Sequence, residues 1–228
     1  MEKQKKFIAF DWNGTLIDDV KPAHKSFAAV QAAYGYPECL LEEYQSYFQI
    51  PIENLFLNAG FPANDVLAEL PKMLGIFHEV YAPLERETPL REGAGDMLES
   101  LAKTGVQSVI FSNHLKYPII ECCEKFGLSR YLDDVLSNED IAEQARSLLK
   151  KERLLRYMAA QGITEKNTII VGDTPEEIEI AREIGAVGVA ITGGYSAQKR
   201  LEACDPEFLI HSLDELPAIA HKIFERAA

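Results

Sequence analysis

Positive charge is in short supply in this sequence of 228 residues, which has 23 lysines and arginines against 36 aspartates and glutamates. The formal net charge of −13 would repel nucleic acids and anionic membranes, so we expect neither as a partner. A small anionic substrate is compatible with this balance, because a few local cations are enough to line a pocket. The sequence indicates no oligomeric state.

Cysteine and long apolar runs are also scarce. The cysteines have no spacing that would suit a metal site, and their expected role is packing: Cys39, Cys122, Cys123 and Cys204. Near the N-terminus only residues 7–10 form an apolar run before Asp11, which is shorter than a secretory signal or a membrane span requires. We therefore expect a soluble protein in the reducing cytoplasm.

Short apolar runs bounded by turn residues predict strands, and their nearly continuous apolar character is typical of parallel strands covered on both faces. The predicted strands are 7–10, 106–111, 134–136, 168–171, 187–191 and 208–210. The helical patterns between them are 95–103, 117–126, 147–161, 176–184 and 213–225. This alternation, which begins near Arg91, predicts an α/β fold with a doubly wound parallel sheet.

The stretch from Asp18 to Pro89 interrupts the alternation, because its patterns are all helical: 22–34, 40–48, 52–59 and 63–81. A simple crossover rarely needs about seventy residues. We therefore predict an α/β core of residues 1–17 and 90–228, with an all-helical cap domain of residues 18–89 inserted after the first strand. Pro71 and Gly75 are expected to kink or divide the last cap helix.

The strongest chemical signal is the motif Asp11-Trp12-Asn13-Gly14-Thr15-Leu16, directly after the first predicted strand. Ligands of open parallel sheets bind beyond the carboxyl ends of the strands, so Asp11 is well placed to attack a substrate or bind a metal. Gly14 permits a tight turn that brings the Asp11 side chain and the Asn13 carbonyl together. Taken alone, the motif also fits an ordinary strand-ending turn.

Two later segments also have polar residues at the end of a predicted strand. Ser112-Asn113 follows the strand 106–111 and suits an anion if it begins a helix, although a plain helix cap would look the same. Gly172-Asp173 follows the strand 168–171 and offers a second carboxylate for a metal. On the helix before that strand, Lys150 or Lys151 either serves the site or faces solvent.

The order Asp11, Ser112, Lys150 and Gly172-Asp173 resembles that of the haloacid dehalogenase superfamily. Within it, the chain is similar to the phosphoglycolate-phosphatase-like branch, in which a helical cap follows the first motif. The resemblance runs from residue 7 to about residue 216. It implies a Rossmann-like core and a magnesium-dependent phosphatase whose substrate is a small phosphorylated metabolite.

The resemblance also implies roles for the motif residues. Asp11 would attack phosphorus and form an aspartyl phosphate, while Mg²⁺ would be held by the Asp11 carboxylate, the Asn13 main-chain carbonyl and Asp173.

The phosphoryl oxygens would be held by Ser112, the Asn113 backbone and a lysine. Lys150 is the preferred lysine because Glu152 and Arg153 follow it as in related helices, and Lys151 is the alternative.

Asn13 is the main departure from the family, whose phosphatases usually have an aspartate there as acid and base. An amide cannot transfer protons in this way, so two alternatives stay open. One is other chemistry of the superfamily, namely cleavage of a phosphonate or a carbon–halogen bond, although the retained Asp173 argues against a metal-free dehalogenase. The other is a regulatory protein with weakened turnover that binds a phosphorylated metabolite.

Two further residues have open roles. Glu177 stands where the family often has an aspartate, and Thr174-Pro175-Glu176-Glu177 is typical of a capping box, with indirect support of the metal as an addition. His114 would face the site and assist a leaving group, but a solvated loop histidine is the preferred interpretation.

Overall fold

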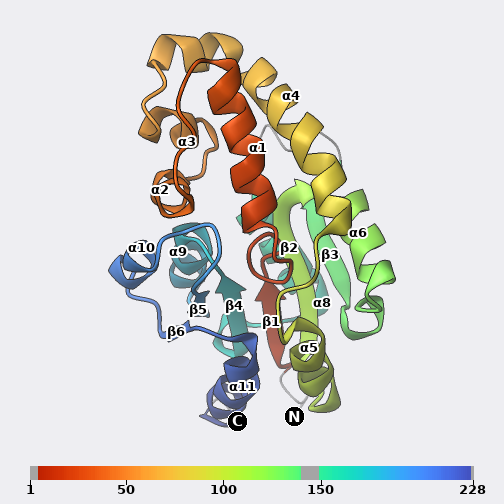
Figure 1. Cartoon of the computed structure of the whole chain (residues 1–228). Coiled ribbons are helices and arrows are strands. Elements are labelled where there is room, and N and C mark those ends of the chain that lie inside the picture. The colour runs from red at the N-terminus through yellow and green to blue at the C-terminus, as the bar shows by residue number, and fades with distance from the viewer. Residues whose placement is uncertain (1–4, 140–148, 227–228) are drawn as a thin grey trace.

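The computed structural model, which describes residues 5–139 and 149–226, has an all-parallel six-stranded sheet in the order β3-β2-β1-β4-β5-β6 (Figure 1). The strands are β1 (Phe7–Phe10), β2 (Gln107–Leu115), β3 (Asp134–Asn138), β4 (Thr168–Gly172), β5 (Val187–Ile191) and β6 (Phe208–Ile210). β1 lies between β2 and β4, where the strand order reverses, and such switch points are where doubly wound sheets bind ligands. The predicted sheet is confirmed.

Helices cover both faces of the sheet, and β1 shows why, because its side chains alternate between two buried faces. Ile8 and Phe10 pack in the cluster that includes α5 (Ala94–Lys103), α6 (Lys116–Lys125) and α11 (Leu216–Arg226). Phe7 and Ala9 pack in the cluster that includes α8 (Leu149–Gln161) and α9 (Pro175–Ile184). A further helix, α10 (Gln198–Ala203), lies between β5 and β6 in the chain.

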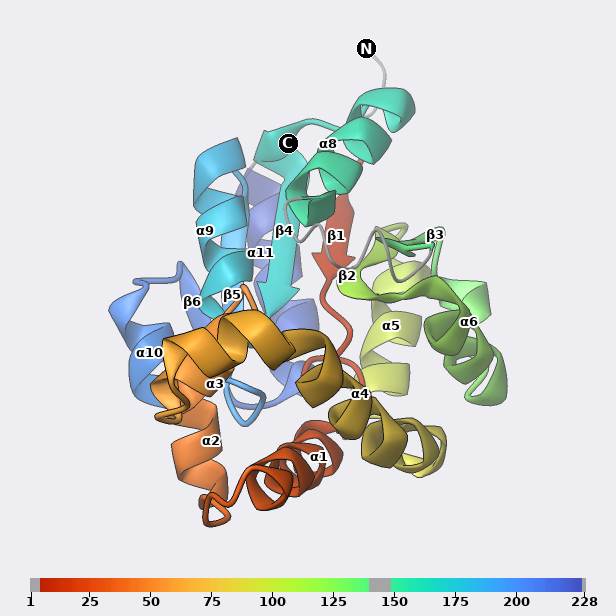
Figure 2. The same cartoon turned by 90° about the horizontal axis from the view of Figure 1, so that it is seen from above.

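Between β1 and α5, a stretch described throughout, the chain forms four helices and no strand. These are α1 (Val20–Ala33), α2 (Leu41–Tyr47), α3 (Glu53–Asn58) and α4 (Ala63–Glu87). They lie beyond the carboxyl ends of the strands, and Figure 2 shows α4 crossing in front of the sheet in the view from above. The helices enclose an apolar cluster of their own, around Phe27, Tyr44 and Phe56, which Tyr195 joins from the loop after β5.

One helix prediction differs from the structure. α4 is continuous from residue 63 to residue 87, so Pro71 and Gly75 do not divide it, and the predicted kink stays a prediction. Buried packing outweighs the local cost of the proline, since Met73 and Tyr81 on this helix are almost fully enclosed. The predicted helix start at Ser147 lies outside the described residues, and α10 was not predicted.

The end of β2 also differs from the prediction. The strand continues to Leu115 past a register shift that follows Phe111, and α6 begins only at residue 116. Ser112 and Asn113 therefore lie within the strand, and the predicted helix start at these residues is wrong. Pairing of Leu115 with Asn138 extends the strand beyond its apolar part. Throughout the described ranges, no helix has the length and apolar character needed to cross a membrane.

Candidate active site

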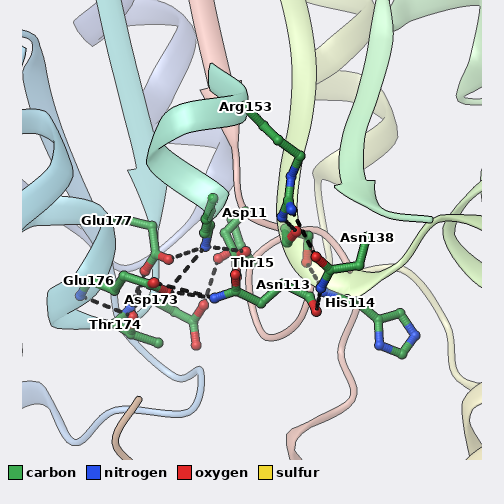
Figure 3. A network of polar contacts seen from close by, with 12 residues as sticks. Asp11, Thr15, Asn113, His114, Asn138, Arg153, Asp173, Thr174, Glu176 and Glu177 are labelled. Atoms are coloured by element: carbon green, nitrogen blue, oxygen red, sulfur yellow. Dashed lines mark hydrogen bonds and ion pairs between the residues drawn. The ribbon is translucent and has the colours of Figure 1, made fainter. Parts of the chain in front are cut away.

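Asp11 begins the loop that follows β1, and its backbone is fixed by a 2.9 Å hydrogen bond from its N–H to the carbonyl of Val171 on β4. The residue is only 6% exposed. Gly14 then turns the chain with a φ of 71°, and a β-carbon there would collide with the carboxylate of Asp173 and the ring of Tyr195. The glycine therefore lets the Asp11 loop approach the end of β4, as Figure 3 shows for the labelled carboxylates.

Gly14→Ala should therefore destabilise the protein by more than the roughly 1–2 kcal/mol that a left-handed conformation costs an L-residue, because a collision adds to it. Gly35→Ala is the matched control, since Gly35 has a φ of 76° and no neighbour within 4 Å of an added β-carbon. Urea unfolding of both variants measures the difference. Equal losses of stability would show that the loop does not pack against Asp173.

Lys150 lies in the first turn of α8 and is 2% exposed. Its Nζ donates to Oδ1 of Asp11 at 2.8 Å and to Oε1 of Glu177, and it lies 3.7 Å from Oε2 of Glu176. Burial alone lowers the pKa of Lys150, but the charges of Asp11, Glu177 and Glu176 outweigh it and raise that pKa above its usual range. The surrounding carboxylates therefore favour the charged ammonium form of Lys150, which donates to Asp11.

Lys151 lies elsewhere, because its Nζ pairs with Glu183 at 2.7 Å and its side chain is 41% exposed. The structure thus brings Lys150, the preferred lysine, to Asp11 and leaves Lys151 at the surface. Glu177 completes the predicted capping box of α9 through hydrogen bonds from the backbone and hydroxyl of Thr174. Its other oxygen holds Lys150, so one carboxylate both begins α9 and orients the lysine.

Asp173 follows β4 and has no exposed surface. Its Oδ1 accepts a hydrogen bond from the Thr15 hydroxyl at 2.7 Å, and its Oδ2 accepts one from the backbone N–H of Tyr195 at 2.6 Å. Burial, followed by the charge of Glu177, raises the pKa of Asp173 to about 7. The pKa of Asp11 is also raised well above its usual range, first by burial and further by the charges of Glu177 and Asp173, although Lys150 opposes the shift.

Carboxylates outnumber cations in this buried region. Among the residues that the structure describes here, the four carboxylates of Asp11, Asp173, Glu176 and Glu177 face the cationic side chains of Lys150 and Arg91. Arg91 donates to the carbonyls of Gly14 and Thr192, and its charge lowers the pKa of Asp173. Such an excess of buried negative charge is unfavourable unless protons or a cation offset it.

The excess charge fits a hard divalent cation. No described residues form a cluster of three or more histidine, cysteine, aspartate or glutamate side chains suited to a metal. A cation such as Mg²⁺ nevertheless needs only one or two carboxylates, because it keeps several waters. Asp11 and Asp173 at neighbouring strand ends meet this requirement.

Ser112 and Asn113 are tied to the helices beside the site. Arg153 of α8 donates to the Ser112 carbonyl and to Oδ1 of Asn138, both at 2.8 Å. Asn138 in turn donates to the Asn113 carbonyl, and the Asn113 side chain donates to Glu176 at 2.9 Å. These contacts hold the end of β2 next to α8 and α9, which carry Lys150 and Glu177.

The structure contradicts the preferred interpretation of His114 as a solvated loop residue. Its side chain is 11% exposed, its Nε2 lies 2.7 Å from Oε1 of Glu85 on α4, and its ring meets that of Tyr81 edge-on. Its backbone N–H donates to the Ser112 hydroxyl at 3.1 Å. His114 thus joins the end of β2 to the helical insertion.

Residues 8–191 match the family model of the haloacid dehalogenase-like hydrolases. The chain belongs to this family. Its resemblance to phosphoglycolate phosphatases is also confirmed: it is 25% identical over 217 residues to that of Vibrio parahaemolyticus, covering 92% of this chain and 94% of the relative. It is 24% identical over 224 residues to phosphoglycolate phosphatase 1 of Pseudomonas aeruginosa, covering 96% and 81%.

Solved structures share the fold of this hydrolase. A haloacid dehalogenase-like hydrolase from Streptococcus pneumoniae superposes with a TM-score of 0.78 at 21% identity, covering 94% of this chain and 98% of the other. A predicted phosphatase from Clostridium acetobutylicum gives a TM-score of 0.79 at 18% identity, covering 96% and 100%. At these identities the structural likeness supports the fold alone.

One group of residues beside the site of this hydrolase was not predicted from the sequence. Asp19, Tyr81 and Tyr195 meet beside Asn13, although they come from the start of α1, from α4 and from the loop after β5. The only local signal was the acidic pair Asp18-Asp19 shortly after the first motif, which also suits an ordinary helix start.

Proposed function

We propose that this hydrolase is a phosphatase that cleaves a small phosphomonoester, with Asp11 as nucleophile. The observation that carries the proposal is the way Asp11 is held: Lys150 binds its Oδ1, and within the described residues its Oδ2 accepts no hydrogen bond. One oxygen is thereby fixed by a cation, and the other remains available to attack. Relatives named phosphoglycolate phosphatases support a small phosphorylated metabolite as the substrate.

In the proposed reaction, Oδ2 of Asp11 attacks phosphorus, and the alcohol leaves with the electron pair of the broken P–O bond and takes a proton from solvent. Water then attacks the aspartyl phosphate and releases one proton to solvent; the acyl P–O bond breaks, which regenerates the carboxylate and releases inorganic phosphate. The ammonium group of Lys150 and the hydroxyl of Ser112 would bind phosphoryl oxygens. Lys150 also favours the ionised form of Asp11, because its charge opposes the rise of the Asp11 pKa.

Mg²⁺ is the proposed cofactor, held by the carboxylates of Asp11 and Asp173 and by the main-chain carbonyl of Asn13. Its positive charge would offset the charges of the phosphate and of the carboxylates around Lys150. The chemistry of the residues supports this set, because two of its three oxygens belong to the carboxylates with the most strongly raised acidic pKa values.

A pH dependence follows from the raised pKa of Asp173, about 7 in the folded protein against an ordinary 3.8. Between these values the folded state binds more protons than the unfolded state. Without metal, stability should therefore fall as pH rises from about 4 to about 7 and then level off. Mg²⁺ should restore the lost stability above pH 7, because it binds the ionised carboxylate.

Thermal unfolding across this pH range, in EDTA and in Mg²⁺, measures both effects, with Asp173→Asn as the control. The variant should lose much of the pH slope and most of the stabilisation by Mg²⁺. A variant with the same slope and the same response to Mg²⁺ would remove Asp173 from the metal site.

Residues 18–89 are proposed to act as a cap domain over a core of residues 1–17 and 90–228. The apolar cluster within α1–α4 supports this division. Polar contacts also join the two parts: the Gln45 side chain donates to the Gly194 carbonyl at 2.6 Å, and Arg200 donates to the Phe48 carbonyl. A cap over the strand ends would choose the substrate.

The cytoplasmic location stays a prediction.

Asn13 supports a second candidate function, a protein that binds a phosphorylated metabolite with little turnover. A panel of small phosphomonoesters, assayed with Mg²⁺ and with EDTA beside an Asp11→Asn control, separates the two. Metal-dependent release of phosphate that the control lacks supports the phosphatase. Saturable binding of a phosphomonoester without release of phosphate would support the second function.

A further inference from the structure

Asp19 is a buried carboxylate that the proposed reaction does not use. It directly precedes α1 and has no exposed surface. Its Oδ2 accepts hydrogen bonds from the Asn13 amide at 2.7 Å, from the Tyr81 hydroxyl at 2.5 Å and from the Tyr195 hydroxyl at 2.6 Å. Its Oδ1 accepts one from the Gly14 N–H at 2.8 Å. Four donors therefore converge on one carboxylate, and no ion pair joins it within the described ranges.

These contacts fix the direction of the Asn13 amide. The nitrogen of the amide has two hydrogens, and it donates to Asp19 and, at 3.0 Å, to the Tyr81 oxygen. Tyr81 accepts that bond because its own hydroxyl hydrogen points to Asp19. The amide oxygen, Oδ1 of Asn13, is left without a donor from the described part of the chain.

Position 13 is therefore built for an amide rather than a carboxylate. An aspartate there would place a second carboxylate at hydrogen-bond distance from Asp19, with no hydrogen between them. Asn13 in contrast offers a donor toward Asp19 and an acceptor on its other side. An amide oxygen accepts hydrogen bonds but does not take up a proton, so it can orient an O–H group and no more.

We propose that Asp19 is a positioning residue of this site, which acts by holding the Asn13 amide so that its Oδ1 accepts a hydrogen bond from the water that attacks the aspartyl phosphate. The inference rests on the proposed function. Asn13 is then part of a working pair with Asp19, and the role of the pair is to orient the water.

Exchanging the side chains of Asn13 and Asp19 tests this inference. Asn13→Asp should lower kcat by about 10-fold to 100-fold and lower the melting temperature, because two carboxylates meet. Asp19→Asn should lower kcat to a similar extent with little change in KM, because the amide of residue 13 loses its acceptor. The double variant Asn13→Asp/Asp19→Asn restores one donor and one acceptor, so its melting temperature and kcat should exceed those of Asn13→Asp.

A pair of tyrosine variants separates positioning from simple packing. Tyr81→Phe and Tyr195→Phe each remove one donor to Asp19, but only Tyr81 also contacts Asn13. If Asp19 acts through Asn13, Tyr81→Phe should lower kcat more than Tyr195→Phe, at comparable losses of melting temperature.

The outcomes distinguish this inference from the proposed function. A wild-type protein that releases no phosphate from any phosphomonoester would overturn both. An active wild type would overturn the inference alone in either of two cases. One is a kcat of Asp19→Asn equal to that of wild type, and the other is a double variant whose losses are the sum of those of the single variants.

Discussion

Asp11→Asn is expected to abolish phosphatase turnover, with a loss of at least about 10⁴-fold in kcat, because an amide is a poor nucleophile toward phosphorus. The variant should stay folded. Lys150 can still donate to the amide oxygen. Removing the charge of Asp11 also reduces its repulsion with the carboxylates of Glu177 and Asp173. In EDTA its melting temperature should therefore equal or exceed that of the wild type.

This combination separates a catalytic loss from a structural one. Steady-state assays with saturating phosphomonoester give the turnover, and thermal unfolding of the same preparations gives the stability. An Asp11→Asn variant that retains more than about 10% of wild-type kcat would exclude Asp11 as the nucleophile, since removal of a nucleophile costs several orders of magnitude.

Lys150→Met should give the second large effect, on catalysis and on stability together. Loss of a cation that binds the phosphoryl group should lower kcat by about 10²–10³-fold, as for other donors that stabilise developing charge. Without metal, the carboxylates of Asp11 and Glu177 would be left buried and unpaired, which costs on the order of 3–5 kcal/mol. Mg²⁺ should recover part of this stability because it offsets the same charges.

Lys151→Met is the matched control, since it changes the adjacent lysine on the same helix. Its Nζ pairs with Glu183 at the surface, and exposed pairs contribute about 0–1 kcal/mol. The control should therefore keep nearly wild-type turnover and stability. A larger loss of kcat in Lys151→Met than in Lys150→Met would show that the phosphate-binding lysine is wrongly assigned.

The sheet and the main motif residues could be predicted from the sequence because their signals are local. Each strand is a short apolar run, and the acids of the site follow directly after two of these runs, at Asp11 and Asp173. Parallel strands place such positions at one edge of the sheet, so their proximity needs no knowledge of side-chain packing. Lys150 was harder to predict, because burial alone separates it from Lys151.

The Asp19 group could not be predicted because its members meet only in the folded protein. Tyr81 lies 62 residues from Asp19 along the chain, and Tyr195 lies 176 residues away. Asp19 on its own has the pattern of a solvated residue before a helix. Long-range contacts also extend β2, through its pairing with β3, past its predicted end, and they keep α4 undivided through Pro71.

The most direct test of the account is to trap the covalent intermediate on Asp11. The wild-type protein would be mixed with a phosphomonoester that it turns over and Mg²⁺, quenched during the steady state, and treated with borohydride, which reduces an acyl phosphate to an alcohol. Peptide mass spectrometry should then find residue 11 converted to homoserine, with no conversion in Asp11→Asn or without substrate. Sustained turnover with residue 11 unmodified and another residue reduced would contradict the account.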